Sequence, residues 1–349
     1  MSGSPVGKAP YKRIATEEAF ATAEMFKLYR NLLERGVDSP AFQSLWGFYL
    51  LSKAERPRQI IERLLDLGDR RLSDMDATGI DMQILSLTAP GVQVLGTDAA
   101  KALSISANDE LAEAIARHPA RFAGLAAFAP QDPRHAAKEL ERGVAKLGLK
   151  GGILNSHVND EYLDDPKFWT IFEAAESLDV PIYLHPSGPS KGLIQPMLEK
   201  GLDGAIFGFG VDTALHALRL IVAGVFDRFP RLKLVLGHLG EALPFWLYRL
   251  DYMHRATVAS NRYESMKPLR KKPSDYMREN VYVTTSGMAW EPAIKFCQDV
   301  MGLDRVLYAM DYPYEFVAQE VVTQDNLSIS LEERTKFFQT NAEKLFKLT

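Results

Sequence analysis

The sequence of 349 residues has a single cysteine, Cys297, which excludes a disulfide framework and any cysteine-rich metal site. It contains no run of about 18 apolar residues, the length that a membrane-spanning helix needs. The N-terminal segment MSGSPVGKAPYKR lacks the apolar core of a secretory signal peptide. These absences predict a cytoplasmic protein that has no membrane partner.

The sequence has no large excess of either sign of charge. Lysine and arginine together number 41 and aspartate and glutamate 45, so the formal net charge is -4. Because no basic surplus exists to neutralise phosphates, a nucleic-acid partner is not expected. The sequence also lacks a Walker motif, and the glycine pair at 208–210 does not have the spacing of a dinucleotide-binding loop. No nucleotide or other organic cofactor is therefore expected.

Short apolar runs alternate along the chain with longer amphipathic segments. Eight of the runs are expected to be strands: Arg13–Thr16, Asp81–Leu87, Arg121–Phe128, Gly151–Asn155, Pro181–Leu184, Leu232–Leu236, Val281–Thr285 and Arg305–Met310. Most are apolar throughout, which is typical of strands buried on both faces of a parallel sheet. The expected helices are Asp98–Arg117, Pro133–Lys146, Pro166–Leu178, Val211–Phe226 and Glu291–Met301.

Eight strand–helix units in a chain of this length predict an α/β fold, a (β/α)8 TIM barrel formed by one domain over residues 1–349. A doubly wound open sheet is the alternative, but its phosphate-binding loop is absent. Two segments fall outside the repeating pattern. The first insertion, residues 20–67, is helical in pattern and follows the first strand, and the second insertion, residues 188–210, is rich in glycine and proline. Insertions at these places usually build the rim of a barrel's site.

Acidic and imidazole side chains gather just after the predicted strands. Glu17 follows the first strand, His185 the fifth and Asp311 the eighth. The C-terminal ends of barrel strands share one rim, so these three side chains are predicted to converge there. Two carboxylates and one imidazole suit a divalent cation, and the oxygen-rich set favours Mn²⁺ or Mg²⁺, with Zn²⁺ less favoured.

A second polar group follows the sixth predicted strand. His238 and Glu241 form an H-x-x-E pattern that is expected to run into a helix, where this spacing puts both on one face. A carboxylate beside an imidazole fixes its tautomer and raises its basicity, so the pair is a candidate catalytic group. A helix-capping pattern is the alternative. For His157, after the fourth strand, a role in lining the pocket and a structural role both stay open.

Several segments together resemble a known family. They are Ile14–Ala21 (IATEEAFA), Ser44–Tyr49 (SLWGFY), Leu202–Val211 (LDGAIFGFGV), Gly237–His254 (GHLGEALPFWLYRLDYMH), Trp290–Cys297 (WEPAIKFC), Tyr308–Tyr314 (YAMDYPY) and Phe337–Lys344 (FFQTNAEK). Over almost its whole length the sequence resembles the aromatic-acid decarboxylase branch of the amidohydrolase superfamily. Within that branch it resembles the 5-carboxyvanillate decarboxylases more than the γ-resorcylate and 2,3-dihydroxybenzoate decarboxylases.

The resemblance implies that Glu17, His185 and Asp311 bind a metal, which is usually Mn²⁺ in the carboxyvanillate enzymes. Ala19 stands where many relatives have the second histidine of an H-x-H motif, which agrees with a harder ion. The implied activity is non-oxidative decarboxylation of 5-carboxyvanillate to vanillate and CO₂ in the catabolism of lignin-derived aromatics. Close relatives of this substrate, such as γ-resorcylate and 2,3-dihydroxybenzoate, stay as alternatives.

Direct loss of CO₂ would leave an aryl carbanion, whereas protonating the ring carbon first avoids it. The resemblance implies that Asp311 supplies this proton, with His238 and Glu241 orienting the substrate or tuning Asp311. Metal-assisted hydrolysis of an amide or lactone is the other chemistry of the superfamily. Ala19 and the absence of a lysine at residues 154–156 disfavour a two-metal hydrolase, which leaves a mononuclear lactonase as the weaker alternative.

A substrate with two carboxylates needs a cation or donors away from the metal. The resemblance implies that Arg56 and Tyr49 of the first insertion, and Thr88 after the second strand, contact the substrate. Arg249 would contact it as well, either in its own subunit or by reaching in from a neighbouring subunit of a homo-oligomer, a dimer or a tetramer. Arginine suits this role because its planar fork binds both oxygens of a carboxylate. Arg58 lies nearby and competes with Arg56 for it.

Overall fold

The computed structural model describes residues 6–348, so the first five residues of the N-terminal segment discussed above lie outside it. Its strands are β1 (Ile14–Phe20), β2 (Met82–Leu87), β3 (Phe122–Gly124), β4 (Ala126–Ala127), β5 (Gly152–Asn155), β6 (Pro181–His185), β7 (Lys233–Leu236), β8 (Val281–Thr284) and β9 (Val306–Leu307). Each predicted strand is present, and the third is divided into β3 and β4 at Leu125. The first strand was predicted too short, because it continues through Glu17 to Phe20.

The strands form two sheets with the orders β1-β2-β3 and β4-β5-β6-β7-β8-β9, and every pairing within them is parallel. Leu125, between β3 and β4, donates its amide to the carbonyl of Leu85 at 2.8 Å. At the other edges, the amide of Thr16 on β1 donates to the carbonyl of Tyr308 just after β9 at 3.1 Å. Backbone hydrogen bonds therefore link the two sheets at both pairs of edges.

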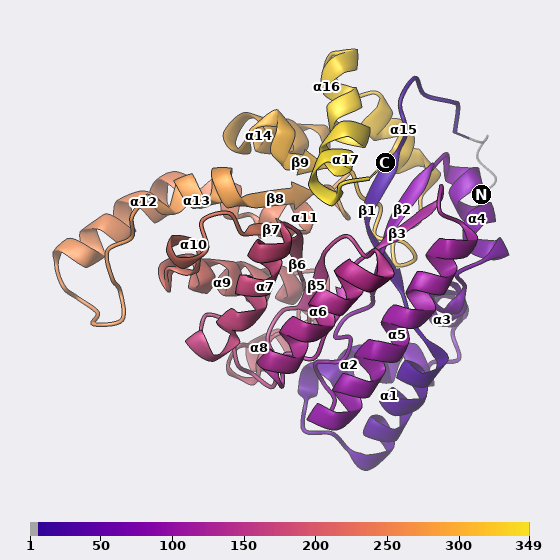
Figure 1. Ribbon diagram of the computed structural model, residues 1–349, viewed down its shortest axis with the longest axis horizontal. Helices are drawn as coiled ribbons and strands as arrows, with labels where there is room; N and C mark the ends of the chain where they lie inside the picture. Colours follow the sequence, from indigo (N-terminus) through magenta and orange to yellow (C-terminus); the bar gives the residue numbers. More distant parts are fainter. Residues whose placement is uncertain (1–5, 349) are drawn as a thin grey trace.

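Helices follow most strands and lie on the outside of the sheets (Figure 1). They are α4 (Asp69–Thr78), α5 (Thr97–Arg117), α6 (Pro133–Leu147), α7 (Trp169–Leu178), α9 (Gly208–Val222), α10 (Val225–Arg228), α13 (Pro273–Asn280), α14 (Glu291–Met301), α15 (Ala318–Asp325), α16 (Leu331–Thr335) and α17 (Asn341–Phe346). All five predicted helices are among them, the third beginning with a 3-10 turn at Pro166–Phe168 and the fourth divided into α9 and α10. Asp132 caps α6 by accepting from the amide of His135, with Pro133 in the first turn.

The first insertion is helical, as predicted. It forms α1 (Ala23–Arg35), α2 (Pro40–Leu51) and α3 (Glu55–Leu65), of which α1 and α2 gather at one end of the molecule (Figure 1). Buried Trp46 fastens α2 to the end of β2, because its indole N–H donates to the carbonyl of Ala89 at 3.1 Å. Tyr29 of α1 donates its hydroxyl to the carbonyl of Gly91. The insertion is thus held over the C-terminal ends of the strands.

Two further segments add to the repeating strand–helix units. The second insertion contains α8 (Lys191–Leu198) and the start of α9, and α12 (Leu243–Ala259) projects from the body together with the loop that follows it (Figure 1).

Cys297 is buried in the core on α14, as its apolar surroundings in the sequence predict. Within residues 6–348, no helix has both the length and the apolar character that a membrane span requires.

Candidate active site

Three elements far apart in the sequence bring Glu17, His185 and Asp311 together. Glu17 lies on β1, His185 ends β6 and Asp311 follows β9. One ligand-type atom of each lies within 4.8 Å of those of the other two, which is a spacing suited to a shared cation. Nε2 of His185 lies 3.4 Å from Oε1 of Glu17. The donor set of two carboxylates and one imidazole fits a divalent ion that accepts oxygen ligands.

An irregularity in β1 places two consecutive carboxylates at the same rim. The pairing of β1 with β2 shifts between Ala15 and Glu18, so that three steps along β1 match two along β2. Such a bulge re-aims side chains that a regular strand would send to opposite faces. Both Glu17 and Glu18 are buried, and Glu17 faces His185 while Glu18 faces the backbone around Asp311.

The two oxygens of Glu17 have different surroundings. Oε2 accepts hydrogen bonds from the hydroxyls of Tyr183 on β6 and Thr284 on β8. Oε1 is buried and has no hydrogen-bond partner among the described residues, although a buried carboxylate oxygen normally has one. The site therefore has an unsatisfied acceptor pointing at the place where the three candidate ligands meet. Neither Tyr183 nor Thr284 was identified from the sequence.

The tautomer of His185 follows from its neighbours. Its Nδ1 lies 2.8 Å from the carbonyl of Pro186, so it carries the proton and donates to that oxygen. Nε2 is then left with its lone pair toward Glu17, as a metal ligand requires. Burial lowers the pKa of His185 below its usual value, which also favours the neutral ring.

His238 and Glu241 meet as the sequence predicts, but on a different backbone. Residues 238–242, which include the turn labelled α11 (His238–Glu241), all have φ between 47° and 76°. The prediction of an ordinary helix start is therefore wrong, because the chain forms a left-handed turn before α12. Left-handed residues other than glycine are strained, and such strain concentrates at functional sites. This backbone still brings Nδ1 of His238 to 2.8 Å from Oε1 of Glu241.

The position of His238 gives it charge near the candidate ligands. Its Nε2 lies 3.9 Å from Oε1 of Glu17. Burial alone would lower the pKa of His238, but the carboxylates of Glu241 and Glu17 outweigh burial and raise the pKa to about 10. In the metal-free protein His238 is therefore an imidazolium beside the Glu17 group.

Asp311 adopts a left-handed conformation, with φ of 67°. Glu18 holds the backbone on both sides of it, because Oε1 accepts from the amide of Met310 and Oε2 from the amide of Tyr312, each at 3.0 Å. Burial raises the pKa of Glu18 to about 8, with the two amides opposing the shift. Burial and then the charge of Glu17 raise the pKa of Asp311 well above its usual range. The adjacent glutamates of β1 thus contact two different parts of the site, and the role of Glu18 was missed from the sequence.

Three of the predicted substrate residues share one neighbour, Tyr314. Its hydroxyl lies 2.5 Å from Oγ1 of Thr88, and its ring packs edge-on against that of Tyr49 with centroids 5.7 Å apart. The guanidinium of Arg56 donates to the carbonyl of Tyr314 at 3.2 Å. Tyr314 lies three residues after Asp311, so this group adjoins the candidate ligands. Its only signal in the sequence was its place in the string YAMDYPY.

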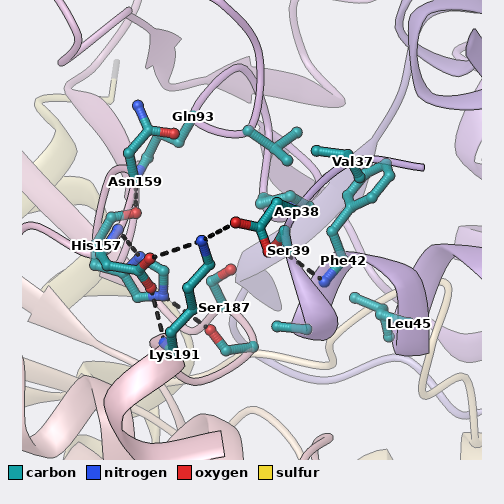
Figure 2. Close-up of a pocket in the computed structure, with 15 residues that line it drawn as sticks. Val37, Asp38, Ser39, Phe42, Leu45, Gln93, His157, Asn159, Ser187 and Lys191 are labelled. Atoms are coloured by element: carbon teal, nitrogen blue, oxygen red, sulfur yellow. Dashed lines mark hydrogen bonds and ion pairs between the residues drawn. The ribbon is translucent and has the colours of Figure 1, made fainter. Parts of the chain in front are cut away.

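Arg249 does not join this group within one chain. It is exposed on α12, among exposed aromatic residues, and forms no ion pair with a described residue. His157 also lies elsewhere, since it lines a cavity of about 170 Å³ between the loop before α2, the segment after β5 and the start of α8 (Figure 2). Both ring nitrogens of His157 are used there, at 3.1 Å from the carbonyl of Gly188 and 3.2 Å from the amide of Asp160. None of Glu17, His185 and Asp311 lines this cavity.

Comparison with known proteins places these features in a family. The family model described as amidohydrolase matches residues 61–348. One similar solved structure is that of 5-carboxyvanillate decarboxylase from Novosphingobium aromaticivorans, complexed with manganese and 4-hydroxy-3-methoxy-5-nitrobenzoic acid. It is 56% identical to this chain with a TM-score of 0.97, and the match covers 99% of this chain and 98% of that chain. The 5-carboxyvanillate decarboxylase of Sphingomonas paucimobilis is 40% identical with a TM-score of 0.92, over 97% and 99% of the two chains.

A curated relative matches the chain over nearly its whole length. The gamma-resorcylate decarboxylase of a Polaromonas species is 38% identical over 346 residues, which cover 96% of this chain and 98% of that protein. The family match covers the elements that carry His185, His238 and Asp311, and the relatives match nearly the whole chain. The chain therefore belongs to the amidohydrolase family.

Proposed function

We propose that this protein is a manganese-dependent decarboxylase that converts 5-carboxyvanillate to vanillate and CO₂. The observation that carries the proposal is the convergence of Glu17, His185 and Asp311 within 4.8 Å, beside the His238–Glu241 pair. The manganese-containing 5-carboxyvanillate decarboxylase that is 56% identical to this chain supports both the ion and the substrate. The unpartnered Oε1 of Glu17 supports a cation at this place, because a positive ion would satisfy it.

Glu17, His185 and Asp311 would hold the ion. When bound, the ion would supply positive charge beside the anionic groups of the substrate and would stabilise the charge that develops in the reaction. Asp311, one of these three residues, delivers a proton to the ring carbon that bears the departing carboxylate. The bond to that carboxylate then breaks, its electron pair returns to the ring, and CO₂ leaves as aromaticity is restored. Solvent returns the proton to Asp311.

The remaining residues of the site hold and orient the substrate. His238, kept in place by Glu241, lies 3.9 Å from Oε1 of Glu17 and so tunes the acid and orients the anionic substrate. Arg56 is an exposed arginine with no carboxylate partner among the described residues, and it binds the carboxylate that the substrate keeps. Tyr49 and Thr88, grouped around Tyr314, contact the ring substituents.

The exposed face of α12 supports a homo-oligomer. Tyr248 is 85% exposed and Phe245 74%, and Trp246 and Tyr252 are also exposed large side chains on this projecting helix (Figure 1). An aromatic patch of this kind is typical of a surface that another protein covers. We propose that a second copy covers it and that Arg249, on the same helix, enters the neighbour's site.

Mixed oligomers test the placement of Arg249. Arg249→Ala and His185→Ala variants are each expected to be inactive, the first through the substrate and the second through the metal. If Arg249 acts in the neighbouring site, mixing and refolding or co-expressing the two restores part of the activity, because a protomer with intact ligands receives Arg249 from its partner. If Arg249 acts in its own chain, the mixture stays inactive. Sedimentation analysis of the unmodified protein gives the oligomer size.

We also propose that the two parallel sheets form a single (β/α)8 barrel domain over residues 1–349. The hydrogen bonds of Leu125 to Leu85 and of Thr16 to Tyr308 support it, because they join the sheets at both pairs of edges. The amide of Ala19 adds another such bond to the carbonyl of Tyr312 at 2.7 Å. A closed arrangement explains how residues on β1 and after β9 contact one site. Cooperative unfolding as one unit, followed by both circular dichroism and tryptophan fluorescence, is the expected behaviour.

One experiment distinguishes the decarboxylase from its alternatives. The purified protein is analysed for bound metal and then offered 5-carboxyvanillate, γ-resorcylate and 2,3-dihydroxybenzoate in parallel with Mn²⁺. We expect CO₂ release with 5-carboxyvanillate at the highest kcat/KM. Faster turnover of γ-resorcylate would assign the chain to the specificity named for its 38% identical relatives. Hydrolysis of a lactone without CO₂ release would refute the proposed function.

A further inference from the structure

Two hydroxyl groups from different strands meet at one oxygen of Glu17. Tyr183 of β6 and Thr284 of β8 both donate to Oε2, the bond from Thr284 measuring 2.7 Å. The two hydroxyl oxygens lie 3.1 Å from one another, and both side chains are buried. Because the donors come from two strands of the sheet, this oxygen is held from two directions by rigid backbone.

The other oxygen of Glu17 is left free for something else. Oε1 is buried, has no hydrogen-bond partner among the described residues, and lies 3.4 Å from Nε2 of His185 and 3.9 Å from Nε2 of His238. Gly237 preserves the space, because a Cβ atom there would lie 2.9 Å from each oxygen of Glu17. A larger residue at position 237 would push the carboxylate out of this orientation. Oε1 is therefore kept pointing at the place where the three candidate ligands meet.

We infer that Tyr183 and Thr284 are positioning residues that make Glu17 bind the proposed ion through Oε1 alone. This inference rests on the proposed Mn²⁺ site. A carboxylate whose second oxygen accepts two hydroxyl hydrogen bonds cannot turn that oxygen to the ion without losing both bonds. Single-atom ligation by Glu17 leaves more of the positions around an ion that prefers six ligands for the substrate's phenolate and carboxylate.

A purely structural role would give a different pattern of effects. Hydroxyls that only compensate the burial of Glu17 would contribute to the stability of the fold, and their removal would leave metal affinity unchanged. Positioning residues change the affinity for the ion and the way in which Glu17 binds it. The two roles therefore separate when metal binding is measured without substrate.

The test uses Tyr183→Phe, Thr284→Val and the double variant. Metal-free protein is titrated with Mn²⁺, and the free ion is measured by electron paramagnetic resonance. Since either hydroxyl alone still holds Oε2, we expect a small loss of affinity in each single variant. The double variant should lose about ten- to a hundredfold, the usual effect of removing groups that orient metal ligands, and more than the product of the single losses.

Two matched controls remove buried hydroxyls elsewhere. Tyr11→Phe deletes a hydroxyl that donates to the carboxylate of Asp325 at 2.9 Å, and Thr78→Val deletes one that donates to a helix carbonyl. Both should leave Mn²⁺ affinity at the wild-type value. A folded double variant of Tyr183 and Thr284 that binds Mn²⁺ as tightly as the wild type would overturn the inference.

A second comparison shows whether the hydroxyls act through Glu17, and it needs only the single variants if the double variant does not fold. In a Glu17→Ala background, removing the hydroxyl of Tyr183 or Thr284 should cause no further loss of Mn²⁺ affinity. A further loss of the same size as in the wild-type background would overturn the inference. The proposed function fails separately, since a wild-type protein that binds Mn²⁺ but releases no CO₂ refutes the activity and leaves the roles of the hydroxyls intact.

Discussion

The recognition of the substrate's second carboxylate by Arg56 gives a sharp prediction. Arg56 lies in the first turn of α3 in the first insertion, is exposed, and makes one side-chain hydrogen bond, to the carbonyl of Tyr314 at 3.2 Å. It forms no ion pair with a described residue, so its charge is available to a ligand. Arg56→Met should therefore weaken turnover of the dicarboxylate more than turnover of a matched monocarboxylate.

The magnitude follows from the kind of contact. A charge-assisted hydrogen-bonded contact contributes roughly 1.5–3 kcal/mol. At about 1.4 kcal/mol per tenfold, this corresponds to a loss of about ten- to a hundredfold in kcat/KM for 5-carboxyvanillate. Screening by water at an exposed arginine moves the expected loss toward the tenfold end. If a neighbouring subunit covers the site, water screens the contact less, and the expected loss in kcat/KM moves toward the hundredfold end.

The assay compares two substrates with three proteins at fixed Mn²⁺. The second substrate, 2-hydroxy-3-methoxybenzoate, keeps the hydroxyl, the methoxy group and the departing carboxylate but lacks the distal one. It should react poorly with the wild type and change little in Arg56→Met, because it never makes the contact. Arg58→Met is the matched control, an exposed arginine on the same helix, and should affect neither substrate. Equal losses for both substrates in Arg56→Met would show that Arg56 supports the first insertion and does not bind the second carboxylate.

Four further predictions concern the site and its support. Asp311→Asn should abolish turnover while part of the Mn²⁺ is retained, because an amide cannot deliver the proton; full metal occupancy with wild-type activity would refute the acid role. Glu17→Ala and His185→Ala should each lower the metal content measured by mass spectrometry, and unchanged tight binding in both would exclude them as ligands. Glu18→Gln leaves one backbone amide beside Asp311 without its acceptor, so we expect a lower kcat and a stability loss of about 1–3 kcal/mol in urea unfolding; a loss of stability with unchanged kcat would make Glu18 purely structural. Burial lowers the pKa of His216 to about 3. Below the pKa of about 6.5 that histidine has in the unfolded chain, the unfolded state binds a proton that the folded state does not, so the folded protein should lose about 2 kcal/mol of stability between pH 6.5 and 5 and more as the pH falls toward 3. His216→Gln should remove this part of the pH dependence of the free energy of unfolding.

The sequence alone predicted the strands, five of the outer helices, the helical first insertion and the rim at which the candidate ligands meet. This was possible because continuous apolar runs identify parallel strands, and the C-terminal ends of such strands lie at one edge whatever their exact bounds. The position of Glu17, His185 and Asp311 in the chain was therefore enough to predict that they converge. Family-specific strings then narrowed the chemistry to a decarboxylase, which composition and periodicity cannot do.

Only the tertiary structure decided how these residues are held. The bulge in β1 that turns Glu17 and Glu18 toward different partners depends on the register with β2, which a single strand's sequence does not encode. The left-handed turn at residues 238–242 went unpredicted because four of its five residues are not glycine, and local preferences oppose that conformation. Tyr183, Thr284 and Tyr314 look like ordinary core aromatics and strand residues in the sequence. Their roles arise from contacts between segments more than 100 residues apart, which are fixed when the strands assemble.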